Sequence, residues 1–155
     1  MNQLTSILMT ALLAMAPVSE LRGAIPFGLA HDIPIAALYP LCVAANILPV
    51  PLIILFIRKI LAWMQRLGGR PQAAADWLIS RGLKKSMLYK KYETLGLFIL
   101  VAIPLPGTGA WTGALVSALL GLRMKFALPA IAAGVAAAGV IVLLVCQGVV
   151  HIAGL

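Results

Sequence analysis

Two ionisable residues, Glu20 and Arg22, stand two positions apart in an otherwise apolar part of the sequence. Ionisable side chains at membrane depth are costly and most often functional. A buried carboxylate can exchange a proton for a cation, and a guanidinium can hold an anion such as phosphate. The structural alternative is an ion pair between the two that only shapes the local turn.

A second group of polar side chains lies in the motif AIPLPGTGAWTG, residues 102–113. The threonine hydroxyls of this motif can form hydrogen bonds, and the Trp111 ring offers a flat apolar or cation-binding surface. Filling a gap between helices is the structural alternative for Trp111. The candidate substrate- or proton-binding residues are therefore Glu20, Arg22, Ser19, Thr108, Trp111 and Thr112.

The composition indicates the environment in which these residues work. Of the 155 residues, 63% are hydrophobic and only four are acidic, which is too little charge for the surface of a soluble domain. The net charge of +8 does not indicate nucleic-acid binding, because nine of the twelve basic residues lie between Arg58 and Lys91. No grouping of residues predicts a metal site, a cofactor or a catalytic triad, so we expect an integral membrane protein that is not an enzyme.

Two uncharged runs, residues 33–57 and 126–150, are long enough to cross a membrane, which takes about 20 apolar residues. The prolines of the first run predict a kink. Asn46 is the one amide side chain inside that run, and we expect it to form a hydrogen bond between helices.

A third uncharged run, residues 94–120, is interrupted in its middle. The arms on either side of the interruption have about ten residues each, or about 15 Å of helix, which is half of a hydrocarbon core about 30 Å thick. This length predicts a re-entrant hairpin that turns at the membrane midplane. The residues that would form the turn are Pro104, Pro106, Gly107 and Gly109.

The first thirty residues repeat this pattern. Residues 3–16 form one arm, the segment from Pro17 to Pro26 forms the turn with Gly23 inside it, and residues 24–30 begin the second arm. An odd number of crossings separates the two hairpins, so they enter from opposite faces. The predicted fold class is an all-α integral membrane protein, an inverted repeat of a re-entrant helical hairpin and a transmembrane helix, whose two tips meet near the midplane.

This interpretation makes residues 1–155 a single membrane domain. Repeat one covers 1–57, a basic connector covers 58–93, and repeat two covers 94–155. Eleven of the twelve basic side chains then fall on one side of the membrane, all except Arg22. The positive-inside rule places that side in the cytoplasm and both termini outside.

The segments PVSELRGAIPFG and IPLPGTGAWTGALVSALLGL resemble the two signatures of the small multidrug export protein family of prokaryotes. This resemblance covers nearly the whole chain and implies an exporter in the cytoplasmic (inner) membrane. The architecture also resembles the DedA superfamily, whose members have two opposed re-entrant hairpins and are linked to translocation of lipids or lipid carriers. DedA-type proteins carry acidic and arginine residues around both hairpins, whereas the second tip here has no charge.

Three hypotheses follow. The first is a secondary transporter that exports a cationic or amphiphilic small molecule, with proton coupling through Glu20. The second is a translocase for an anionic lipid or lipid carrier, held by Arg22 and the N–H groups of the tips. The third is a non-transporting membrane scaffold. The expected partners are the lipid bilayer, a small amphiphilic molecule or lipid, and a second copy of the chain in a homodimer, with no nucleic acid.

Overall fold

The computed structural model describes residues 2–89, 93–105 and 107–153, with the side chains of residues 2–80, 94–105 and 107–149. Within these residues the chain forms helices and no strand, which confirms the all-helical prediction. The helices are α1 (Gln3–Met15), α2 (Glu20–Ala30), α3 (Ile35–Ile47), α4 (Val50–Leu67), α5 (Gly69–Tyr89), α6 (Glu93–Ala102), α7 (Ala110–Leu119) and α8 (Met124–Ala153).

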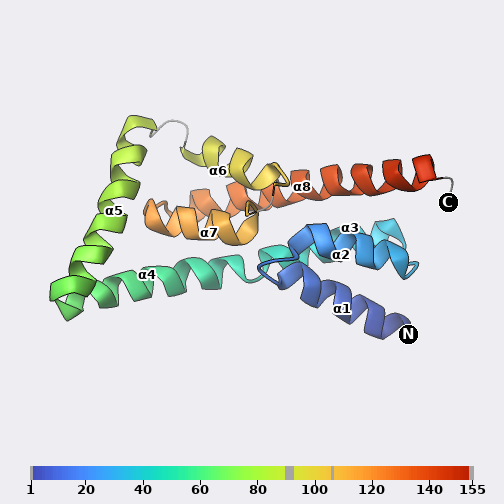
Figure 1. Cartoon of the computed structure of the whole chain (residues 1–155), viewed down its shortest axis with the longest axis horizontal. Coiled ribbons are helices and arrows are strands. Elements are labelled where there is room, and N and C mark those ends of the chain that lie inside the picture. Colours follow the sequence, from blue (N-terminus) through green and yellow to red (C-terminus); the bar gives the residue numbers. More distant parts are fainter. Residues whose placement is uncertain (1, 90–92, 106, 154–155) are drawn as a thin grey trace.

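The helices α1 and α2 form one hairpin, and α6 and α7 form a second (Figure 1). The two hairpins point in opposite directions along the long axis, and their turns come together in the middle of the molecule. The chain formed by α3 and α4 runs antiparallel to α8 along the same axis. As a result α1 begins and α8 ends at one end of the molecule, while α5 lies at the other end.

In the described part of the chain, two helical segments are long and apolar enough to cross a membrane, Ile35–Leu67 and Met124–Val149. The first of these combines α3 and α4, which meet at a break over Leu48 and Pro49. The break agrees with the kink expected from the prolines, because a proline lacks the N–H that would continue the helical hydrogen bonds. The second segment belongs to α8, a helix of 30 residues.

The first part of the predicted basic connector, 58–93, is helical and continues from the preceding apolar run. Helix α4 continues to Leu67, well past the predicted end of the span at residue 57. The chain then turns at Gly68 and Gly69, both with positive φ, into α5, which crosses the end of α4 at a steep angle (Figure 1). A hydrogen bond of 2.7 Å from Gln65 Nε2 to Asp76 Oδ1 joins the two helices near this corner.

The first turn is shorter than the sequence predicted. The prediction placed Gly23 and Pro26 in the turn, and this is wrong because both lie inside α2. Pro26 is exposed on that helix and carries its ring outward. Gly23 is required for close packing rather than for a reversal, since a Cβ there would lie 2.7 Å from the Cβ of Ser19. The turn itself occupies residues 16–19 and includes Pro17.

The second turn agrees more closely with the prediction. Helices α6 and α7 have ten residues each, and the backbone between them, residues 103–109, is not helical where it is described. Gly107 has a φ of +84° and Gly109 a φ of +147°, conformations that L side chains rarely adopt. Pro104 lies in this turn, and the predicted turn residue Pro106 lies outside the described residues.

Small residues allow close packing within the second hairpin and between this hairpin and α8. A Cβ at Gly113 would lie 2.6 Å from Val101 Cγ2, and a Cβ at Gly134 would lie 2.7 Å from the Cβ of the same valine. Large apolar side chains instead cover the outside of the molecule, where lipid would solvate them. Examples are Leu4, Leu8 and Leu12 on α1, Leu52, Leu55 and Phe56 on α4, and Leu144 and Val145 on α8.

Both hairpins end their second arm in the same way. The amide of Ile33 bonds to the carbonyl of Gly28, and the amide of Leu122 bonds to the carbonyl of Ser117. Each of these bonds spans five residues and encloses a residue of positive φ, Asp32 in the first hairpin and Gly121 in the second. This is the Schellman motif, which closes a helix and redirects the chain. The next helix of each half follows within three residues.

Candidate functional site

The two hairpin turns are joined by Arg22, from the first turn of α2. Its Nη2 donates a hydrogen bond of 2.6 Å to the carbonyl oxygen of Thr108 and lies 3.1 Å from the Thr108 hydroxyl. That hydroxyl also organises its own turn, since it bonds to the amide of Leu105 and to the carbonyl of Ile103. Two segments that are 86 residues apart in sequence therefore meet through one guanidinium.

Glu20, the first residue of α2, contacts the beginning of α7. Its Oε1 accepts a hydrogen bond of 3.3 Å from the backbone N–H of Trp111, in the first turn of that helix. A carboxylate is stabilised there because a helix N-terminus carries partial positive charge and unpaired N–H groups. The N-cap of α7 is Gly109, which has no side chain to cap the helix. A Cβ at Gly109 would collide with the Glu20 carboxylate, so the glutamate occupies the place of a cap.

Glu20 and Arg22 do not form an ion pair with each other in the part of the chain that the structure describes. Both belong to α2, and side chains two apart in a helix point to different faces. Each therefore reaches a different part of the opposite hairpin. The two opposite charges still attract each other through space.

The backbone at Glu20 is unusual. Its φ of +44° lies in the left-handed region, which a residue with a side chain seldom occupies. Such a conformation costs about 1–3 kcal/mol and is kept where the surrounding structure imposes it. Glu20 is also buried, with 8% of its surface exposed. The strain and the burial coincide with the contact to α7.

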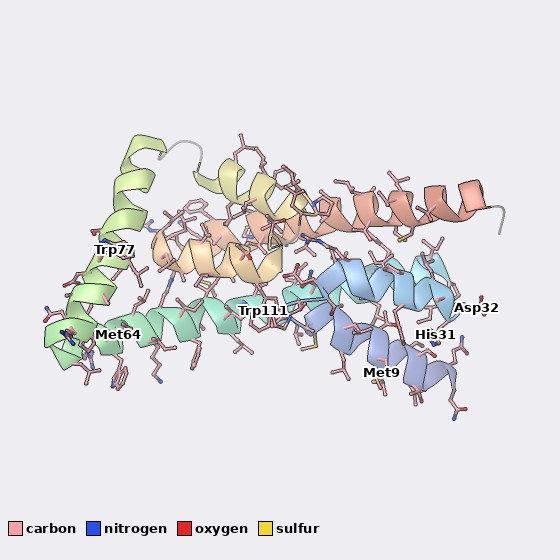
Figure 2. All side chains as sticks on the ribbon, in the orientation of Figure 1. Met9, His31, Asp32, Met64, Trp77 and Trp111 are labelled. Carbon is pink, nitrogen blue, oxygen red and sulfur yellow. The ribbon has the colours of Figure 1, made fainter. Side chains whose placement is uncertain are left out.

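The remaining predicted site residues support the turns. Trp111, in the first turn of α7, lies near the centre of the molecule (Figure 2), and its indole N–H donates a hydrogen bond of 3.0 Å to the carbonyl of Met15 at the end of α1. Ser19 donates 2.6 Å to the carbonyl of Leu13, and Thr112 donates 2.8 Å to the carbonyl of Gly107. Glu20, Arg22, Thr108 and Trp111 thus form contacts between the hairpins, whereas Ser19 and Thr112 bond within their own hairpins.

A small cavity of about 10 Å³ lies beside these contacts. Its polar lining consists of Glu20, Arg22 and Asn46, and its apolar lining comes from α2, the second hairpin and α8. Asn46 is 1% exposed, and its Oδ1 has no hydrogen-bond partner. The sequence-based expectation that Asn46 bonds helices together therefore fails for this oxygen atom.

Residues 20–141 match the model of the family described as "Putative small multi-drug export protein". The chain belongs to this family. No curated protein and no solved structure matches it. Together with the two long apolar helices, the match identifies a membrane protein of an export family.

In this export-family protein the match covers the second turn and, apart from Val142, the residues that line the cavity. It begins at Glu20, and it leaves out α1, whose Met15 carbonyl accepts the Trp111 indole hydrogen bond. Sequence reasoning had named Asn46 but had not assigned it to the site, because nothing in the chain indicates that residue 46 packs beside residue 20. One sequence signal could have assigned Asn46 to the site. It is a single amide in an apolar run, placed three residues before Pro49, where the helix breaks.

Proposed function

We propose that this protein is a secondary transporter that exports a cationic or amphiphilic small molecule and exchanges protons at Glu20. The observation that carries the proposal is a buried carboxylate, without an ion-pair partner among the described residues, that holds the two hairpin turns together. A carboxylate in such a position can bind a proton or a cation, and competition between the two is sufficient for exchange.

The contact between Glu20 and α7 supplies the coupling step. The ionised carboxylate is attracted to the N-terminal end of α7, and protonation removes most of that attraction. The turns then separate, and access to the space between them changes from one side of the membrane to the other. Arg22 stays hydrogen-bonded to the Thr108 carbonyl and so limits how far the two turns separate.

The architecture that suits this mechanism is an inverted repeat in the cytoplasmic membrane of a prokaryote. Three features support it: the hairpins point in opposite directions, the long apolar segments are antiparallel, and both hairpins end in a Schellman motif (Figure 1). The basic connector, 58–93, lies in the cytoplasm and both termini lie outside, by the positive-inside rule. We expect the protein to act as a homodimer.

Transport by the Glu20→Gln variant tests the coupling. The substitution keeps the size of the side chain and its ability to accept from Trp111 N–H, but removes the charge. The purified variant is placed in liposomes with an imposed pH gradient and tetraphenylphosphonium as the test cation. We expect it to lose the pH-driven transport that the parent protein shows. Glu20→Asp should keep transport with an altered pH dependence.

The matched control for this experiment is Asp32→Asn, which neutralises an exposed acid at the end of α2. This variant should transport as well as the parent protein. If Glu20→Gln also matches the parent at every pH around neutrality, Glu20 is a structural cap and proton exchange is ruled out.

Topology is tested by labelling single cysteines in a background that lacks Cys42 and Cys146. A cysteine at Asp32 should react with a membrane-impermeant reagent from outside intact cells, and one at Arg70 or Met124 should not. External labelling at Met124 would mean that 94–120 crosses the membrane, which contradicts the double-hairpin arrangement.

A translocase for an anionic lipid or lipid carrier is the second candidate, as in the DedA superfamily. The observation that favours it is Arg22, a half-buried cation beside a helix N-terminus, the two features that bind phosphate best. The two candidates differ in the sign of the substrate charge. Arg22→Gln should abolish binding of a phosphate lipid and leave binding of a cation intact.

A further inference from the structure

A groove with a volume of about 380 Å³ lies between α3 and α8. Each helix presents one face to it, because the lining residues recur at helical spacing. In Figure 1, α3 and the second half of α8 lie toward the end of the molecule where α1 begins and α8 ends. The residues that line the groove are Ile35, Ala36, Tyr39 and Pro40 on α3, and Val140, Leu143, Leu144 and Gln147 on α8.

Tyr39 forms the contact that holds the two helices together beside the groove. Its hydroxyl donates a hydrogen bond of 2.9 Å to the carbonyl of Ala136, and its ring lies close to Gly139, where a Cβ would be 3.0 Å from Tyr39 Cε2. Ala36 lies almost one helical turn before Tyr39, and its small side chain leaves the space in front of α8 unfilled. The groove opens to the surface, where Val140 is exposed.

The volume of the groove suits an organic molecule. Sites for drug-sized ligands measure about 300–1,000 Å³ and combine a mostly apolar lining with a few polar groups. The groove has both properties. The cavity beside Glu20, at about 10 Å³, has room for one water molecule. In this conformation the groove can therefore hold an organic substrate, whereas the Glu20 cavity cannot.

Two hydrogen-bonding groups of the groove lack a usual partner. Pro40 has no N–H, so the carbonyl of Ala36, four residues earlier, loses its helical donor. The amide of Gln147 is exposed on α8 and forms no hydrogen bond with another described residue. A polar group in apolar surroundings is costly unless it is hydrogen-bonded. These two groups therefore favour a ligand that carries a hydrogen-bond donor over the hydrocarbon chain of a lipid.

The charge of the lining narrows the class of ligand further. None of the eight residues that line the groove is acidic or basic. A compact, strongly hydrated cation would lose its water there and find no opposite charge in return. A molecule with an apolar body gains free energy in proportion to the apolar area that it buries. The groove therefore suits an amphiphile, which has an apolar body and a hydrogen-bonding group.

We propose that the groove between α3 and α8 binds an amphiphilic organic molecule, whose donor group bonds to the Ala36 carbonyl and to Gln147. This inference rests on the proposed function, because it assigns the exported molecule to the groove and leaves Glu20 for the proton. With both termini outside, the groove lies in the outer half of the membrane. Helices α3 and α8 also carry Asn46 and Val142, which line the Glu20 cavity, so a shift between these helices changes both spaces.

Ethidium is a suitable probe of the groove, because it combines a flat aromatic body with amino donors and its fluorescence rises when it leaves water. The full chain in nanodiscs is titrated with ethidium, and empty nanodiscs of the same lipids measure its partition into the bilayer. We expect a saturable rise in fluorescence above that of the empty nanodiscs. Choline, a cation without an apolar body, should not displace the bound ethidium.

Four variants place the binding in the groove. Val140→Trp fills the space and should abolish saturable binding, whereas the matched control, Leu55→Trp on the exposed face of α4, should bind as the parent does. Gln147→Leu and Pro40→Ala should each weaken the affinity roughly fivefold, the effect of one lost hydrogen bond. Pro40→Ala supplies the N–H that pairs with the Ala36 carbonyl. Its melting temperature should equal or exceed that of the parent, which separates lost binding from lost folding.

The inference is overturned if the parent protein binds no more ethidium than empty nanodiscs do, which is the result for a groove that lipid chains fill. It is also overturned if Val140→Trp binds ethidium as the parent does. A third result would assign the groove to a dimer interface and overturn the inference as well. That result is a disulfide between two copies through a cysteine at Leu144, in a background that lacks Cys42 and Cys146.

Transport of ethidium into or out of liposomes with an imposed pH gradient separates this failure from that of the proposed function. Glu20→Gln should bind ethidium as the parent does and fail to transport it. Transport that persists in Val140→Trp refutes the groove as the substrate site and leaves the exporter proposal intact. Binding that Val140→Trp removes, without pH-driven transport by the parent protein, supports the groove and refutes the proton-coupled exporter.

Discussion

The two hairpins have the same outline and opposite chemistry at their turns. The first carries Glu20 and Arg22 at the start of its second arm. The second has no ionisable side chain between Thr94 and Leu122, and it contributes the carbonyl and hydroxyl of Thr108 and the N–H of Trp111. One hairpin provides charges, and the other provides the backbone groups that solvate them.

This difference shows how an arrangement of similar halves can hold a charged site. Two turns with charges of the same sign would repel each other, and two turns without charge would hold no ion. Here a carboxylate meets a helix N-terminus and a guanidinium meets a carbonyl, so each charge has an opposite partial charge on the other hairpin. The polar backbone groups of the uncharged second turn thus complement the charges of the first.

The largest expected effect comes from Gly109→Ala, which would disrupt the complementarity of the turns. The new Cβ would collide with the Glu20 carboxylate, and alanine is strained at a φ of +147°. We expect a loss of about 3 kcal/mol in the free energy of unfolding, from strain and the lost cap together. Denaturant unfolding in detergent measures this free energy for the variant and the parent protein.

Gly107→Ala is the matched control for that change. Gly107 also has a positive φ, but a Cβ there would meet nothing within 4 Å, so only strain of about 1 kcal/mol is expected. If both glycine variants are destabilised equally, the close approach of Glu20 to Gly109 has no energetic importance.

A smaller effect is expected at Thr108, where the hydroxyl joins the two turns. Thr108→Val keeps the shape and removes the bonds to Arg22, Leu105 and Ile103, which should destabilise the protein by about 2 kcal/mol. Thr108→Ser keeps the hydroxyl and should remain within about 0.5 kcal/mol of the parent. Thermal unfolding compares the pair, and a serine variant as unstable as the valine variant would assign the effect to the lost methyl group.

The smallest effects belong to side chains that bond within one hairpin. Ser19→Ala removes the bond to the Leu13 carbonyl, and Thr112→Val removes the equivalent bond to the Gly107 carbonyl. Each should cost about 1 kcal/mol. The two bonds lie on different hairpins, so the losses of the two single variants in the free energy of unfolding should add up in the double variant. A clear departure from additivity would mean that the hairpins respond to each other even through these local bonds.

The sequence predicted the helical class, the second turn and the meeting of the two tips, because long uncharged runs and clustered proline and glycine are local signals. It misplaced the first turn, since Pro26 and Gly23 resemble turn residues but lie inside α2, one exposed and one packed against Ser19. It also left Asn46 out of the site. A contact between α3 and α2 depends on tertiary packing, which no local pattern of residues encodes.

The capping of α7 by Glu20 has a consequence for the synthesis of the protein. The acceptor and its donor are 91 residues apart, so Glu20 leaves the ribosome long before Trp111 exists. At about 5–20 residues per second, the interval is roughly 5–18 s. During that time neither charge of the first hairpin has its final partner, and a bare carboxylate is costly in lipid. We therefore expect the first hairpin to enter the membrane fully only after the second hairpin has been synthesised.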